Sequence, residues 1–282
     1  MASYVLITGA AGGFGKALAA ECAGRGWDLL ITDYSSEKLS LVAQGLERQF
    51  GVKVYFFACD LTDPDSRDKL WDFIKQNQMR FKMLLNVAGA EFEGPFAERT
   101  LLQLRTMVRL NVEANVENTR NILLFRDPIR PLRIVFVSSL AGFNPMPVKA
   151  VYASTKRFLI NLTYALREEF LPEEVTFTVV APSGMPTTQQ AIRGICVQGF
   201  LGRLTTKNVG DVAAKTIDHA LAGKALYVPG FANQLARFFS GLFPETYMAH
   251  IIGKRWKATY KKRQADNSAL IPSRYKINRY IG

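Results

Sequence analysis

Short runs of β-branched and aromatic residues alternate along the chain with longer stretches in which apolar residues recur every three or four positions. The short runs have the length of buried strands, and the longer stretches that of amphipathic helices. This alternation is typical of an α/β fold with a parallel sheet, helices on both faces and right-handed crossovers. Seven strands are expected, at Tyr4–Thr8, Asp28–Thr32, Lys53–Ala58, Met83–Val87, Arg133–Ser138, Thr176–Ala181 and Ala225–Val228.

The helical stretches follow the strands in turn, so the sheet is expected to be doubly wound. They lie at Gly13–Arg25, Ser36–Phe50, Asp65–Gln78, Thr100–Phe125, Ala150–Leu171 and Val209–Ala222. No repeat or linker interrupts the pattern, and residues 1–230 are expected to form one domain. Residues at about 187–207 lie outside the alternation and are interpreted as a lid. Residues 231–282 are expected to form a basic, helical C-terminal extension.

The charge of the chain is unevenly distributed. It has 36 Lys and Arg against 24 Asp and Glu, a net charge of +12. Residues 232–282 hold ten of the basic residues and two of the acidic ones, a net charge of +8, which leaves +4 for the rest. Because the main domain is nearly neutral and no groove-reading motif is present, we expect no nucleic-acid partner.

Cysteines and histidines are few. Three Cys without a Cys-x-x-Cys spacing and two His leave no basis for a zinc site or a disulfide framework, so no metal is expected. A reducing, cytoplasmic location is the expectation. The N-terminus lacks the pattern of a secretory signal. The most apolar late stretch is interrupted by Pro229, Asn233 and Arg237, so no transmembrane segment is expected.

The first strand runs into TGAAGGFG, from Thr8 to Gly15, and then into a helix. In such a turn, backbone N–H groups and the helix N-terminus favour the phosphates of a dinucleotide. Asp33 closes the second strand, where a carboxylate can accept hydrogen bonds from the adenosine ribose and would repel a 2′-phosphate. No Lys or Arg lies in the glycine turn, and NAD is therefore predicted over NADP. Asp60 follows the third strand, where it fits either an adenine contact or an ordinary turn.

A tyrosine and a lysine four residues apart, Tyr152 and Lys156, occur in YASTK on a predicted helix. An ammonium group beside a phenol lowers the pKa of the phenol and makes it usable as an acid or base near neutrality. A second pair with this spacing, Tyr34 and Lys38, lies on the adenine side and carries no assigned role. The first pair follows a strand that ends in serine, at the carboxyl edge where such sheets bind ligands.

In combination, these motifs resemble those of the short-chain dehydrogenase/reductase family, from Ala2 to about Pro229. TGAAGGFG matches the cofactor loop, NVAG at Asn86–Gly89 resembles the segment after the fourth strand, and VSSLAG and YASTK match the active-site motifs. Two positions depart from the family pattern: Val87 replaces a second Asn, and PSG at Pro182–Gly184 replaces Pro-Gly.

The resemblance implies an oxidoreductase that transfers a hydride between NAD(H) and an alcohol or ketone. Tyr152 would exchange the proton and Ser139 would hydrogen-bond the same oxygen. Lys156 would lower the pKa of the tyrosine, and Asn111 would hold a water that links Lys156 to solvent. The implied cofactor-binding residues are Thr8, Gly9, Gly13, Phe14, Gly15, Asp33, Asp60, Leu61, Asn86, Ala88, Gly89, Tyr152, Lys156, Pro182, Gly184 and Thr187.

The segments after the fifth and sixth strands should flank the reacting carbon. Their apolar side chains favour a sizeable apolar substrate, such as a steroid or a long-chain carbonyl compound. They are Phe143, Met146, Val148, Met185, Ile192, Ile195, Val197, Phe200 and Leu201. A protein that binds the dinucleotide without turnover, as a sensor or scaffold, is the alternative.

After Pro229 the pattern predicts two amphipathic helices, the second with apolar residues opposite a basic face. These helices are expected to pack on the enzyme, where their apolar face can cover the substrate pocket, or on a second subunit. Peripheral contact with a membrane is the alternative. The family resemblance also implies a homodimer or homotetramer, formed through the helices that follow the fourth and fifth strands.

Overall fold

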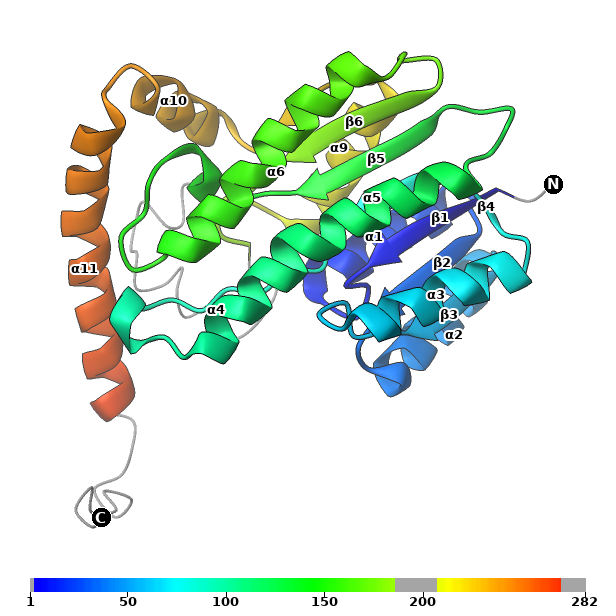
Figure 1. Ribbon diagram of the computed structural model, residues 1–282, viewed down its shortest axis with the longest axis horizontal. Helices are drawn as coiled ribbons and strands as arrows, with labels where there is room; N and C mark the ends of the chain where they lie inside the picture. The colour runs from blue at the N-terminus through cyan, green and yellow to red at the C-terminus, as the bar shows by residue number, and fades with distance from the viewer. Residues whose placement is uncertain (1–2, 186–206, 270–282) are drawn as a thin grey trace, which may run out of the picture.

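The computed structural model describes residues 3–185 and 207–269, with side chains described as far as residue 261. Figure 1 shows a twisted central sheet with helices on both sides, and a long C-terminal helix at one edge of the molecule. The proposed lid, with Thr187, falls almost wholly outside the described residues.

The sheet has seven parallel strands in the order β3-β2-β1-β4-β5-β6-β7. This confirms the predicted fold class. The chain order reverses between β1 and β4, and ligands of such sheets bind beyond the carboxyl ends of the strands at that point. The strands are β1 (Ser3–Thr8), β2 (Leu29–Asp33), β3 (Val54–Ala58), β4 (Arg80–Asn86), β5 (Leu132–Val137), β6 (Val175–Val180) and β7 (Leu226–Tyr227).

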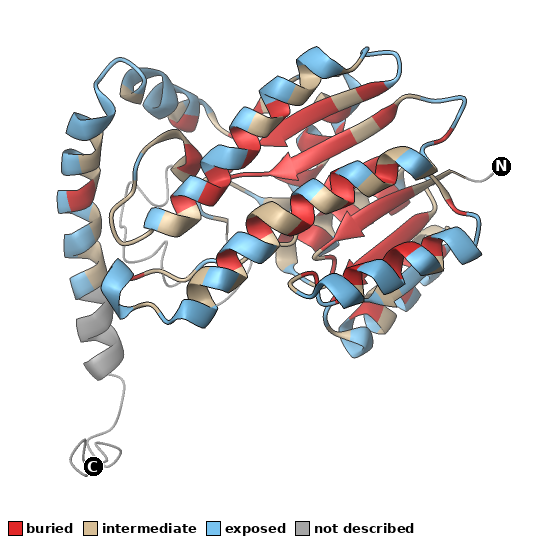
Figure 2. Ribbon diagram, viewed as in Figure 1, coloured by how far each residue is buried: buried red, intermediate tan, exposed pale blue. Residues whose placement is uncertain are grey.

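Helices cover both faces of the sheet, as doubly wound connections require. Those on one face are α1 (Gly13–Gly24), α2 (Ser36–Phe50) and α9 (Val209–Leu221); those on the other are α3 (Pro64–Gln76), α5 (Ala114–Ile122) and α6 (Ala150–Glu169). Figure 2 shows the strands as the buried layer between them. Each face of the sheet has its own apolar core, because the strand side chains alternate between the two faces.

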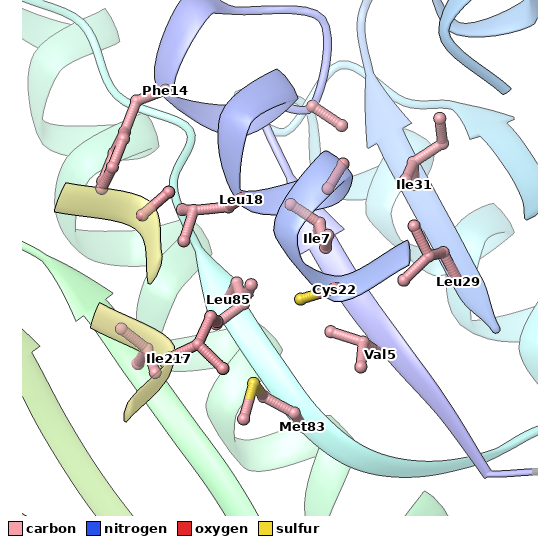
Figure 3. Close-up of a cluster of buried hydrophobic side chains, with 14 of the residues drawn as sticks. Val5, Ile7, Phe14, Leu18, Cys22, Leu29, Ile31, Met83, Leu85 and Ile217 are labelled. Atoms are coloured by element: carbon pink, nitrogen blue, oxygen red, sulfur yellow. The ribbon is translucent and has the colours of Figure 1, made fainter. Parts of the chain in front are cut away.

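The first core lies on the face covered by α1, α2 and α9, and the second lies on the face covered by α3, α5 and α6. Alternate strand residues and the inner faces of the helices build the first core. Figure 3 shows Val5, Ile7 and Leu85 of the strands against Leu18 of α1 and Ile217 of α9. All five side chains are fully buried. Burial of each such side chain contributes about 1.5–3 kcal/mol, and the sheet edge that carries the site is therefore rigidly supported.

The helix expected at residues 100–125 is not continuous. Helix α4 (Leu101–Val108) passes through a π-helical turn at Arg109–Glu113 before α5 begins. The side-chain amide of Asn115 donates to the backbone oxygens of Leu110 and Asn111, both at 3.1 Å, and so satisfies carbonyl groups at this turn. The turn is invisible to an apolar-periodicity argument, yet it carries Asn111, and π turns recur at functional sites.

The C-terminal region forms two helices, α10 (Phe231–Ser240) and α11 (Glu245–Ala269). They lie beside the carboxyl edge of the sheet rather than on either of its faces (Figure 1). Among the residues that the structure describes, no helix is both long and apolar enough to cross a membrane.

Candidate active site

The glycine turn between β1 and α1 is folded so tightly that two of its positions require glycine. Gly9 has φ +67°, and a Cβ there would lie 2.8 Å from the backbone of Ala88. At Gly15 a Cβ would lie 2.1 Å from the carbonyl oxygen of Gly9. The side chain of Thr8 fixes the same region to β4, since its Oγ1 accepts from the N–H groups of Val87 at 2.9 Å and Ala88 at 3.1 Å.

The N-terminus of α1 is suited to bind an anion. Its N-cap, Gly12, supplies no side-chain acceptor, and the first turn holds no acidic residue. The exposed backbone donors and the helix dipole therefore favour a phosphate. The glycine turn behind this N-terminus leaves a cradle that a Cβ would fill, and the cradle fits a dinucleotide. Gly13 lies in the first turn of the helix, and Phe14 lies at the wall of the adjoining cavity.

Asp33 lies at the end of β2, beside the glycine turn. Its carboxylate accepts from the N–H of Ala11 at 3.0 Å and from the N–H of Tyr34 at 2.9 Å. The side chain is 9% exposed. The carboxylate thus has a fixed position and stabilises the turn, in addition to any contact with a ribose.

Three other predicted cofactor residues have neighbours that give them structural roles. Asp60 accepts from the N–H and hydroxyl of Thr62, both at 2.8 Å, as in an ordinary turn. Leu61 is buried in the second core. Asn86 faces α5, where Asn118 Nδ2 donates to its Oδ1 at 3.4 Å. Asp60 thus makes the contacts of an ordinary turn, and all three residues contribute to holding the strand ends in place.

Ser139, Tyr152 and Lys156 meet at one wall of a cavity beyond β4, β5 and β6. The Ser139 hydroxyl lies close enough to the Tyr152 phenol to affect its pKa. The Nζ of Lys156 lies 5.7 Å from the centre of the Tyr152 ring and donates to the carbonyl oxygen of Val137 at 2.7 Å. The structure therefore brings the three predicted groups together, with the ammonium beside the ring rather than bonded to the phenol oxygen.

The backbone after β5 holds Ser139 opposite α6. Ser138 Oγ donates to the carbonyl oxygen of Lys156 at 2.8 Å. A Cβ on Gly142 would lie 2.9 Å from the carbonyl carbon of Lys156, so this segment packs directly on the helix. The distance between Ser139 and Tyr152 is thereby set by main-chain contacts.

Burial dominates the electrostatics of the pair. It raises the pKa of Tyr152, the charge of Glu91 raises it further, and the neighbouring Ser139 hydroxyl lowers it. Burial also lowers the pKa of Lys156 from 10.5 to about 8. The sequence argument expects the ammonium to lower the pKa of the phenol; in this structure desolvation of both groups outweighs that effect, because neither charged form is well solvated.

The lowered pKa of Lys156 predicts a dependence of stability on pH. Between pH 8 and 10.5 the unfolded chain binds more protons at this lysine than the folded protein does, so its contribution to stability rises with pH there. Relative to Lys156→Met, the wild-type free energy of unfolding should increase across this range in urea titrations. A difference that is flat or falls would contradict the burial of a titrating ammonium.

Asn111 is fully buried and makes three side-chain hydrogen bonds. Its Oδ1 accepts from Ala90 N at 2.8 Å, and its Nδ2 donates to Ala90 O at 2.9 Å and to Thr155 Oγ1 at 3.0 Å. A Cβ on Gly89 would lie 3.1 Å from Asn111 Oδ1 and 3.2 Å from Lys156 Nζ. Asn111 thus holds the loop after β4 against α6. The sequence predicted that Asn111 holds a water, and it did not predict this structural role.

The segment after β6 forms another wall of the cavity through Pro182, Gly184 and Met185. Pro182 O accepts from Leu140 N at 2.9 Å. Ser183, the residue that departs from the family pattern, accepts from Asn233 Nδ2 at 3.0 Å. The inserted serine therefore connects this wall to α10.

The cavity has a volume of about 900 Å³, and much of its wall comes from the C-terminal helices. The expectation that these helices pack on the enzyme is met, since Gly253 packs on Pro147 and Asn144 Nδ2 donates to Ser240 Oγ at 3.2 Å. Helices α10 and α11 contribute Ala236, Ser240, Met248, Ile251, Ile252, Arg255 and Trp256 to the wall. Of the apolar loop residues predicted for the pocket, Met146 and Met185 line it, and Phe143 and Val148 are not among its lining residues. The other five, Ile192, Ile195, Val197, Phe200 and Leu201, lie outside the described residues.

A charged cluster at the cavity wall was missed by the sequence argument. Lys149, at the start of α6, is ion-paired with Glu91 and lies 3.4 Å from Glu93. Its Nζ also lies 4.9 Å from the centre of the Trp256 ring. No motif marks these residues, because they come from three separate segments. Among the described residues, no group of His, Cys, Asp or Glu side chains could hold a metal ion.

Comparisons with known proteins agree with this geometry. The family model for short chain dehydrogenases matches residues 3–193. The chain is 34% identical to sulfoacetaldehyde reductase 2 of Chromohalobacter salexigens over 191 residues, 67% of this chain and 75% of that protein. It is 25% identical to human 17-beta-hydroxysteroid dehydrogenase type 3 over 268 residues, 89% of this chain and 82% of that protein.

A solved short-chain dehydrogenase from Sphingobium yanoikuyae, in complex with NADPH, superimposes with a TM-score of 0.72. It is 23% identical and covers 99% of this chain and 100% of its own. The NADPH in that protein gives no support to a preference for NAD here. The family match over more than half of the chain, together with the fold, shows that the chain belongs to the short-chain dehydrogenase family of oxidoreductases.

Proposed function

We propose that the protein transfers a hydride between NAD(H) and the alcohol or ketone carbon of an apolar substrate. The observation that carries this proposal is the meeting of Ser139, Tyr152 and Lys156 at the wall of one cavity, which Phe14 beside the glycine turn also lines. An acid/base pair and a dinucleotide cradle thus open into the same space.

The cradle assigns the parts of the cofactor to residues of this chain. The glycine turn and the N-terminus of α1 would hold the pyrophosphate, and Asp33 the adenosine ribose. Lys156, Pro182 and Gly184 would hold the nicotinamide half within the cavity. A bound nicotinamide supplies or accepts the hydride.

The chain's own groups handle the proton. Tyr152, a phenol that is neutral at physiological pH and whose pKa burial raises further, donates its proton to the substrate oxygen in the reductive direction and takes it back in the oxidative one. Ser139 donates a hydrogen bond to the same oxygen as charge develops there. The Lys156 ammonium stabilises the phenolate that forms, and Asn111 holds the neighbouring loop in place.

The walls of the cavity favour an apolar substrate of considerable size. Met146, Met185, Met248, Ile252 and Trp256 line it, and its volume of about 900 Å³ is shared between the nicotinamide half of the cofactor and the substrate. Similarity to a human hydroxysteroid dehydrogenase over most of both chains supports the same substrate class.

An activity screen tests the proposal directly. Steroids, long-chain carbonyl compounds and small ketones are offered with NADH, and the matching alcohols with NAD, while absorbance of the reduced cofactor is followed. Turnover with bulky apolar compounds and not with small ketones is the expected result. Tight cofactor binding without turnover of any compound would instead support a sensor or scaffold.

The fixed carboxylate of Asp33 supports NAD as the cofactor, since a 2′-phosphate would approach a buried negative charge. We expect NADH to bind at least about tenfold more tightly than NADPH. Asp33→Asn keeps an oxygen acceptor for Ala11 N and should narrow this ratio. Calorimetric titration of both cofactors into both proteins measures it, and tighter binding of NADPH by the wild type would refute the assignment.

We further propose a homodimer formed through α4, α5 and α6. Val108, Val116 and Phe158 on these helices are exposed apolar residues, and Val112 lies among them in a shallow apolar hollow. A self-complementary helical face of this kind is typical of symmetric dimers. Phe158→Glu should halve the mass found by sedimentation equilibrium, whereas an unchanged mass would exclude this interface.

We also propose a division of the chain into two parts: residues 1–230 form the catalytic domain, with a lid at about 187–207, and residues 231–282 form the extension.

Two described cysteines, Cys22 and Cys59, are buried free thiols. They support the proposed reducing, cytoplasmic location.

A further inference from the structure

Helix α10 is attached to the protein through its polar side. Asn233 is fully buried, and its Nδ2 donates to Pro229 O at 2.6 Å and to Ser183 Oγ at 3.0 Å. Gln234 Nε2 donates to Val228 O at 3.0 Å, and Ser240 Oγ accepts from Asn144. An amphipathic helix on the surface of a globular protein normally packs by its apolar face, and α10 has the opposite orientation.

The apolar face of α10 consequently points outward, and the turn into α11 extends it. Phe238 is 63% exposed, Leu242 63% and Phe231 73%. Isolated exposed apolar residues are ordinary, but a contiguous patch of large ones marks an interaction surface. The outer patch, as we name it, consists of Phe231, Leu235, Phe238, Phe239, Leu242, Phe243 and Tyr247.

Positive charge accompanies the outer patch. Residues 231–261 contain five basic residues and one acidic residue. The acidic one, Glu245, lies 3.2 Å from Arg157. Lys254, Lys257 and Lys261 of α11 are all exposed. Aromatic and leucine side chains on one helix, followed by a run of lysines, have the chemistry of a segment that lies at an anionic lipid surface.

We propose that the outer patch docks the protein on the surface of an anionic membrane, with α10 in the interfacial layer and the lysines of α11 at the headgroups. The sequence left two alternatives for these helices, packing on the protein and contact with a membrane. The proposal combines them: the inner side of the helices packs on the enzyme, and the outer side contacts the membrane. A second copy of the chain is the weaker occupant, because the apolar hollow at Val108, Val112 and Phe158 already serves the proposed dimer, whereas basic residues accompany the outer patch.

Docking would place the cavity beside the bilayer. Ile251 is 45% exposed and also lines the cavity, and Ala236 and Ser240 on the inner side of α10 line it as well. An apolar substrate dissolved in lipid would then have a short path to Tyr152. The docking itself does not depend on the proposed catalytic function, since binding to vesicles can be measured without turnover.

The test is co-sedimentation of the full-length chain with vesicles of equal parts phosphatidylserine and phosphatidylcholine, and with vesicles of phosphatidylcholine alone. We expect binding to the anionic vesicles that weakens in high salt. Phe238→Glu/Phe239→Glu should weaken it at least about tenfold. Leu124→Glu/Ile129→Glu is the matched control, because both residues are exposed and precede β5, at the amino end of the sheet.

Circular dichroism and thermal melts establish that both double variants fold. Equal binding by wild type and Phe238→Glu/Phe239→Glu, or the same loss in the control, would overturn the proposal. So would absence of vesicle binding together with a concentration-dependent mass that the Phe238→Glu/Phe239→Glu variant abolishes in sedimentation equilibrium, because a second copy would then occupy the patch. In a separate assay without vesicles, the rate of cofactor turnover should be the same for the wild type and for every folded variant.

Discussion

Replacement of Tyr152 by phenylalanine should lower kcat by about 10²–10⁴-fold, the range that a positioned general acid contributes. The ring still fills its place on α6, but the hydroxyl that donates the proton is removed. Binding of NADH should be retained, because the glycine turn, Asp33 and Lys156 are unaltered. Fluorescence titration of NADH and steady-state turnover with any active substrate measure the two quantities.

Tyr164→Phe is the matched control for this prediction. Tyr164 lies on the same helix, is 42% exposed and is outside the cavity lining. Its loss of a hydroxyl should leave both NADH binding and turnover unchanged. If Tyr152→Phe retained wild-type turnover, or if it lost NADH binding together with activity, the acid/base assignment would fail.

Replacement of Gly15 by alanine should abolish or greatly weaken cofactor binding. The added methyl group would lie 2.1 Å from the carbonyl oxygen of Gly9 and 2.8 Å from Ala10 Cα, so the glycine turn has to move away from α1. Overpacking of this kind costs about 1–3 kcal/mol of stability. A shift of the phosphate donors should reduce NADH affinity by about tenfold or more.

The control is alanine at Gly45, in the middle of α2, where a Cβ meets no atom within 4 Å. Alanine is a better helix former than glycine by about 1 kcal/mol, so Gly45→Ala should raise the melting temperature without affecting NADH binding. Chemical unfolding and cofactor titration of the two variants separate a general effect of alanine from the local one. Unchanged NADH affinity in Gly15→Ala would contradict the proposed phosphate cradle.

The sheet and its layers were predictable because period-two and period-3.6 patterns report directly on burial. All seven strands occur within a few residues of the predicted ranges. The π-helical turn at Arg109–Glu113 was not predictable, because it depends on the Asn115 amide reaching two carbonyl groups of the preceding turn. Hydrophobic spacing contains no information on such a side-chain contact.

The site was predictable to the extent that it resides in contiguous motifs. The glycine turn and the Ser139, Tyr152 and Lys156 constellation could be found from the sequence, and the structure places them around one cavity. The cluster of Lys149, Glu91 and Trp256 could not, because three distant segments meet only in the folded protein. The inner face of α11 was recognised as apolar, and the sequence left open whether it covers the substrate pocket or a partner subunit; the structure places it at the wall of the cavity.

Transfer of deuterium from the nicotinamide to a substrate carbon is the most direct test of the proposed chemistry. The protein is incubated with NADH deuterated at both C4 positions and a panel of steroid and long-chain ketones, and the products are analysed by mass spectrometry. The proposal predicts alcohols that carry one deuterium on the carbinol carbon, formed by the wild type and by Tyr164→Phe but not by Tyr152→Phe. Tight binding of NADH without deuterium in any product of the panel would contradict hydride transfer. It would favour a dinucleotide-binding protein without turnover.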